Sequence, residues 1–268
     1  MNNDLPLFYR ELAAFDINTH GKMHLPDSLP DYKFAAQTNI IPLLVHEAGL
    51  ASRHYPLVFI PGSEGGAPVL AAMVGVGDNV NCFVDAEGKW LDGAYIPAWV
   101  RRYPFFAVRE EEGKDPLLAI DPAAEWLQQD EGETLTTESG EPSQRLERVL
   151  AFQREFQLFA ERTEAITMAL QEAGVLEEGA MRIDPPRGAS EGDKGEAGGR
   201  QINGFMLVNE GKLKALSDEA LLKLHQADAL GLAYIQLISM ASLPNLVRQV
   251  AVQAAPVREK PVKGKSRK

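Results

Sequence analysis

Apolar residues divide the chain into three regions of different periodicity. Prolines at positions 6, 26, 30 and 42 interrupt every apolar run within residues 1–54, so that region is predicted to be irregular. Short apolar runs follow up to residue 120, and helical spacing dominates from Ser143 onward. The pattern predicts strands first and helices afterwards.

The central region is predicted to form strands. Tyr55–Pro61 is an apolar, β-branched run bounded by prolines, which is typical of a buried strand. Val69–Val76 is a second candidate, although its alanines and methionine leave a helix open. A hairpin is expected around Gly88, which suits a positive φ. Its two strands would be Asn81–Val84 and Lys89–Leu91. Further strands are predicted at Phe105–Val108, Leu117–Ile120 and Gly204–Val208.

Helices are predicted in five places. Pro97 and Pro104 bracket a helix of about two turns. The longest helix is expected from Ser143, its N-cap, to Gly174, with an apolar stripe containing several phenylalanines that we interpret as core. Ser217 caps a later helix, and further helical runs follow Gly231 and Pro244.

These elements define an α+β fold, with a mixed β-sheet packed by one long helix and a C-terminal helical cluster. We expect a single domain over residues 1–255. A flexible, glycine-rich excursion is expected at residues 187–200, and a disordered basic tail at residues 256–268. The acidic stretch between Asp130 and Glu141 is predicted to be a surface loop.

Charge is distributed unevenly along the 268 residues. The net charge is −11, yet residues 256–268 hold six basic residues and one acid, so residues 1–255 carry −16. An acidic body disfavours general nucleic-acid binding. The tail is expected to be weakly adhesive and able to contact an anionic partner, and it lacks the aromatics that stack on bases.

Sequence features indicate a soluble cytoplasmic protein. Cys82 is the only cysteine, so no internal disulfide exists. Met1–Arg10 has no secretory pattern, and Ala227–Leu243, the most apolar stretch, contains polar residues and is interpreted as a buried helix.

No catalytic motif stands out, and we expect neither a metal nor a cofactor. His20 and His24 have a spacing that suits a metal only on a helix, which Gly21 and Pro26 disfavour. Gly62–Gly66 lacks the Gly-Lys-Ser/Thr ending of a phosphate loop, and no nucleophile has an identifiable base. Enzymatic activity is left open, and the residues favour its absence.

The segment from Trp90 to Phe105 is the candidate site. On a two-turn helix Trp99 and Tyr103 would be neighbours, with Arg101 and Arg102 beside them. Arginines beside aromatic rings suit a carboxylate or phosphate ligand. The alternative is a structural wedge whose arginines pair with acids. The candidate ligand-binding residues are Arg101, Arg102, Trp99, Tyr103, Tyr95 and Trp90.

If these residues bind a ligand, Arg101→Ala or Arg102→Ala should abolish binding at nearly unchanged melting temperature. Loss of folding would support the structural interpretation.

Several blocks of the chain resemble the SapC-like bacterial family. The distinctive block spans residues 81–105, including Asn81–Asp85 and Arg101–Phe105, and the resemblance covers roughly residues 5–250. The glycine-rich excursion and the basic tail fall outside it. The family is named for its association with surface-layer loci, and its members often lie beside halogenase-like proteins and outer-membrane receptors.

The resemblance implies a soluble, non-enzymatic accessory or binding protein of a surface-layer or uptake-associated system, with an unidentified protein partner. It supplies no catalytic residues. The competing hypothesis is an enzyme or small-ligand binding protein that uses the arginine-aromatic segment at residues 95–105.

Overall fold

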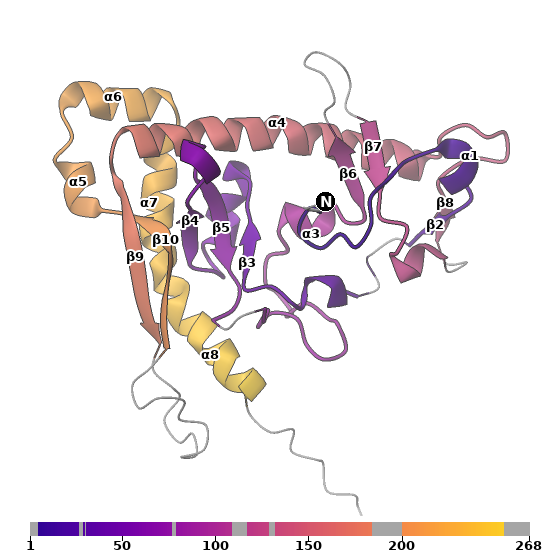
Figure 1. Cartoon of the computed structure of the whole chain (residues 1–268), viewed down its shortest axis with the longest axis horizontal. Helices are drawn as coiled ribbons and strands as arrows, with labels where there is room; N and C mark the ends of the chain where they lie inside the picture. Colours follow the sequence, from indigo (N-terminus) through magenta and orange to yellow (C-terminus); the bar gives the residue numbers. More distant parts are fainter. Residues whose placement is uncertain are drawn as a thin grey trace, which may run out of the picture.

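The computed structural model describes residues 5–26, 29, 31–76, 79–108, 117–128, 132–183 and 200–254 (Figure 1). Its α-helices are α1 Ile17–His20, α2 Ala48–Ala51, α3 Ala98–Arg101, α4 Gln144–Glu172, α5 Glu210–Lys214, α6 Asp218–Gln226, α7 Ala229–Ser239 and α8 Leu243–Ala254. Short 3-10 helices are η1 Lys33–Ala35, η2 Val45–Glu47, η3 Ser63–Gly65, η4 Glu125–Gln128 and η5 Met240–Ser242. The strands are β1 Ala13–Ala14, β2 His24–Leu25, β3 Ile40–Pro42, β4 Leu57–Ile60, β5 Val69–Met73, β6 Phe105–Val108, β7 Leu117–Ile120, β8 Glu133–Thr134, β9 Leu176–Ile183 and β10 Arg200–Val208.

The α+β class is confirmed, but the strands expected in one sheet lie in two, and a third sheet is formed by two strands that were not predicted. The largest has the order β3-β5-β4-β10-β9, the second β1-β7-β6, and β2 pairs with β8. Every recorded strand pair is antiparallel. Two strands of the large sheet, β3 and β9, were not predicted.

Strand β4 is the centre of the main core. Leu57, Val58 and Phe59 are all fully buried, as expected of a strand covered on both faces. Helix α7 packs on β4 and β10, and α4 packs on β5.

Two polar side chains of α7 complete the hydrogen bonding of this sheet. Gln236 accepts from Val208 N at 3.0 Å and donates to Leu57 O at 3.1 Å, and Ser239 Oγ accepts from Leu57 N at 2.9 Å. Because buried backbone groups need partners, α7 is an integral part of the sheet.

Helix α4 spans the large sheet and the three-stranded sheet β1-β7-β6 (Figure 1). Ser143 caps it, its Oγ accepting from Leu146 N at 3.3 Å, and Gly174 follows it with φ +67°, as predicted. Leu146 near its start joins the aromatic core beside β6, whereas Ile166 and Leu170 join the main core.

Three predictions change. The hairpin around Gly88 is reduced to one bridge, Val84 to Trp90, although Gly88 does have φ +87°. The helix after Pro97 has one turn and not the predicted two. It ends at Arg101, and residues 102–104 form a non-helical turn. Most of the glycine-rich excursion, residues 187–199, and the tail 256–268 lie outside the described residues, and Arg200 already begins β10.

Among the described residues, one helical stretch, Ala229–Gln253, is long and apolar enough to cross a membrane by length and composition alone. Only 33 % of the most apolar 18 residues of this stretch is buried inside the fold. The expectation of a buried helix therefore holds for one side of it.

Candidate functional site

Glu47 is a fully buried carboxylate at the end of η2. Its Oε1 accepts from Tyr95 Oη at 2.7 Å, from Ala98 N at 2.7 Å and from Arg101 Nη2 at 3.3 Å. Its Oε2 accepts from Leu44 N at 3.0 Å. These bonds join η2 to the start of α3, so Glu47 sets the position of Arg101.

Arg101 belongs to this network and still reaches solvent. Its side chain is 41 % exposed, and its Nε donates to Ile96 O at 3.0 Å. The guanidinium lies 5.4 Å from the ring centre of Phe152. The expectation that the arginines pair with acids is thus met at one residue, by a single buried acid.

Arg102 is buried among aromatic rings, at 3 % exposure. Its guanidinium carbon lies 4.0 Å from the ring centres of both Phe106 and Phe156, and Nη2 donates to Gln153 Oε1 at 3.3 Å. Its Nε is buried without a hydrogen-bond partner. Burial lowers the pKa of Arg102 to about 10.

Trp99 and Tyr103 are not neighbours on one helical face as predicted, because α3 already ends at Arg101. Tyr103 stacks on Phe34 in the aromatic core, whereas Trp99 contacts Phe156 and lines a different cavity. Trp90 lies in the main core, donating from Nε1 to Tyr55 Oη at 3.2 Å.

Three of the predicted residues meet at one cavity of about 300 Å³ beneath the N-terminal half of α4. They are Arg101, Arg102 and Tyr103. The other lining residues are Leu25, Pro26, Leu29, Phe105, Arg145, Arg148, Val149, Phe152 and Gln153. We call this cavity the arginine pocket. Its described lining holds four arginines and no acid.

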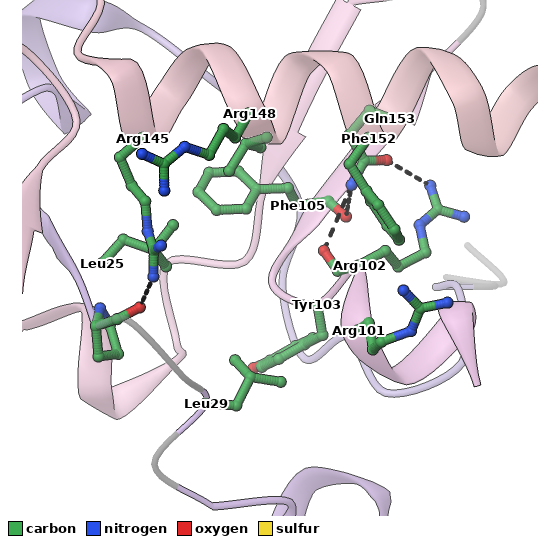
Figure 2. A pocket seen from close by; sticks show the side chains of 12 residues that line it. Leu25, Leu29, Arg101, Arg102, Tyr103, Phe105, Arg145, Arg148, Phe152 and Gln153 are labelled. Atoms are coloured by element: carbon green, nitrogen blue, oxygen red, sulfur yellow. Dashed lines mark hydrogen bonds between the residues drawn. The ribbon is translucent and has the colours of Figure 1, made fainter. Parts of the chain in front are cut away.

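Two of these arginines come from the first turns of α4. Arg145 Nη2 donates to Pro26 O, and Arg148 Nη2 donates to Gln144 Oε1 at 2.7 Å. Figure 2 shows Arg145 and Arg148 along α4 at one end of the pocket and Arg101 and Arg102 at the other, with the Phe105 ring between them. The positive end of the long helix adds to the field there.

Arg145 and Arg148 were not predicted. Their spacing of three residues, followed by Phe152 and Gln153, places all four on one helical face. In the sequence, the two arginines and Gln153 beside the phenylalanine stripe were the pattern from which this part of the pocket could have been predicted.

The pocket is suited to binding an anion. Guanidinium groups pair bidentately with carboxylates and phosphates, and aromatic rings pack on an apolar body. None of its described lining residues is a serine, cysteine, histidine, lysine or acid, the usual nucleophiles and bases.

The histidines show no common site. His20 ends α1, its Nδ1 accepting from Asp16 N at 2.9 Å, while His24 lies in β2. Among the described residues, no group of three or more His, Cys, Asp or Glu side chains is arranged to hold a metal ion.

The fold and the site define the class of this protein: it is an α+β protein with an arginine-lined pocket. The chain belongs to the SapC family, whose model matches residues 16–246. No curated protein and no solved structure gives a significant match.

Stability is expected to fall as the pH rises from 9 to 11. Burial raises the pKa values of Tyr9 and Tyr55 well above 10.0, and that of Cys82 from 9.0 to about 11. These groups ionise first in the unfolded chain, so their stabilising effect is complete below pH 9 and is lost as the pH rises.

The lowered pKa of Arg102 acts in the opposite direction above pH 10. At pH 11 each tyrosine costs about 1.4 kcal/mol and Cys82 about 2 kcal/mol, against a gain of about 1.4 kcal/mol from Arg102, so we expect a net loss of about 3 kcal/mol. Urea denaturation at several pH values and constant ionic strength measures this loss of stability. Tyr55→Phe should make the free energy of unfolding fall less steeply with pH. A urea midpoint that does not change between pH 9 and 11 would contradict the expectation.

Proposed function

We propose that this protein is a non-enzymatic binding protein whose ligand is a small organic anion. The observation that carries the proposal is the arginine pocket, with four arginines and no acid among its lining residues. In a chain of net charge −11, such a cluster is not a consequence of overall composition.

The size and walls of the pocket define the ligand class. A cavity of about 300 Å³ lies at the small end of ligand sites. Leu25, Val149 and the Phe105 and Phe152 rings provide apolar walls, and arginines lie at both ends. A carboxylate or phosphate attached to a short apolar or aromatic body would satisfy both kinds of wall.

The individual arginines support different roles. Arg101 is held by Glu47 and Ile96 and remains partly exposed, and Arg148 is exposed, so these two can meet an incoming anion. Arg102 is stacked between rings and adds positive potential from the wall. A site whose cations are already oriented loses little side-chain entropy on binding.

Family membership supports a second part of the proposal, the accessory role. We propose that the ligand-binding chain serves a surface-layer or uptake-associated system from the cytoplasm, together with a protein partner. Affinity purification from the native host tests this part, and recovery of a small molecule without a stoichiometric protein would contradict it.

Calorimetric titration with phenyl phosphate, phenylacetate and inorganic phosphate tests the ligand class. We expect binding of at least one aromatic anion, and a loss of at least tenfold in affinity on Arg148→Gln, about 1.4 kcal/mol. Arg101→Gln should have an effect of the same size.

Arg154→Gln is the matched control, because Arg154 is exposed on the same helix and is not part of the pocket lining. Thermal melts of all variants confirm that they fold. Absence of binding by all three probes would contradict the proposal. So would equal affinities of the Arg148 and Arg154 variants.

A further inference from the structure

The C-terminal end of the chain is chemically unlike the rest. From Ala229 to Lys268 there are seven basic residues and one acid, a net charge of +6, whereas residues 1–228 carry −17. Within α7, η5 and α8 the only charged residue is Arg248. Positive charge therefore follows directly on the most apolar helical stretch of the molecule.

The same helices present large apolar side chains to solvent. Ile238 and Tyr234 on α7 are 67 % and 46 % exposed, and Val252 on α8 is 62 % exposed. The opposite side of α7 packs on the sheet, with Leu232 and Ala233 buried. Exposed apolar groups of this size beside a basic segment are typical of a membrane-surface helix.

We propose that the exposed faces of α7 and α8 form a peripheral docking surface for an anionic lipid membrane, supported by the positive charge that follows them in the sequence. Ile238, Tyr234 and Val252 would enter the boundary between headgroups and acyl chains. Arg248, which is exposed on α8, would contact the phosphates of the headgroups, and the basic residues that follow Ala254 in the sequence would add to the attraction. Charge complementarity favours this partner, because the net charge of +6 on residues 229–268 attracts anionic headgroups. The acidic remainder of the protein is repelled by the same lipids and would face away from the membrane.

The helices lie on the membrane and do not cross it. Gln236 and Ser239 supply hydrogen bonds to the backbone of β4 and β10, and Leu246 of α8 is fully buried. Insertion across the bilayer would strip these buried sheet groups of their partners. The surface is also independent of the arginine pocket, which lies under the other half of α4.

Vesicle flotation with the full chain tests the proposal. We expect binding to vesicles of phosphatidylcholine mixed with phosphatidylglycerol, little binding to phosphatidylcholine alone, and release at high salt. Removing residues 256–268 should weaken binding at least tenfold, and Ile238→Glu should do so independently.

Leu158→Glu is the control, because Leu158 is 65 % exposed on α4, nearly the same exposure as Ile238. It should leave vesicle binding unchanged, and circular dichroism should show all variants folded. Binding that ignores lipid charge would overturn the proposal, as would an Ile238→Glu variant that binds like the Leu158 control. Tail-dependent binding to single-stranded RNA without vesicle binding would assign the surface to nucleic acid instead.

Discussion

Glu47→Ala is expected to lower the free energy of unfolding by about 3–5 kcal/mol, because two buried donors and one half-buried donor lose their acceptor at a cost of about 1–2 kcal/mol each. Those donors are Leu44 N, Tyr95 Oη and Ala98 N. Arg101, the fourth, can turn to water because it is partly exposed. For a chain of this length the melting temperature should fall by about 10 °C.

Urea denaturation followed by circular dichroism measures the change. Glu47→Gln retains an acceptor for Tyr95 and Ala98, so its loss should be about half as large. Glu155→Ala, an exposed acid on α4, should change stability by less than about 0.5 kcal/mol. If Glu47→Ala were no more destabilising than Glu155→Ala, the network would not hold η2 to α3.

Arg102→Ala is expected to cost about 3 kcal/mol, because it leaves a cavity between Phe106 and Phe156 and removes their contacts with the guanidinium. The hydrogen bond to Gln153 Oε1 is lost as well. A loss of ligand binding in Arg102→Ala could therefore result from lost packing, so this variant alone does not measure the contribution of Arg102 to binding.

Arg102→Met separates the two effects. Methionine fills the space between the rings and removes a charge that burial disfavours, so stability should remain within about 1 kcal/mol of the original. Affinity for the anionic probe should nevertheless fall, because the pocket loses one positive charge. Chemical denaturation and calorimetric titration of both variants distinguish these outcomes. Equal destabilisation by methionine and alanine would show that the guanidinium itself holds the core together.

The elements that were predicted correctly are those with a strong local signal. Residues Ser143 to Gly174 contain an N-cap, a continuous apolar stripe and a terminating glycine, and α4 follows them closely. β6 and β7 have the predicted bounds, and β4 lies within its predicted run. In each case neighbouring residues alone determine the local conformation.

The unpredicted strands depend on distant partners. Ile40–Pro42 is too short to be recognised and becomes a strand because Ile41 pairs with Ala72 of β5. Leu176–Ile183 contains acids and a glycine, and it becomes a strand by pairing with β10. Strand pairing across many residues leaves little trace in a local pattern.

Half of the pocket's four arginines could be predicted. Arg101, Arg102 and Tyr103 stand out because two arginines lie among aromatics within one short segment. Arg145, Arg148 and Gln153 lie more than 40 residues away, and only the packing of α4 over β6 brings them to the same cavity. Glu47 was not among the predicted site residues.

The sequence by itself determined the α+β class, the long capped helix, the family and the separation of an acidic body from a basic end. These properties depend on composition, local periodicity and matching blocks of residues. The tertiary structure decided which cations share a cavity, which one is buried between rings, and which acid holds Arg101 in place. The physical reason is that burial and pairing arise between residues far apart in the chain, and their energies depend on the three-dimensional arrangement that brings them together.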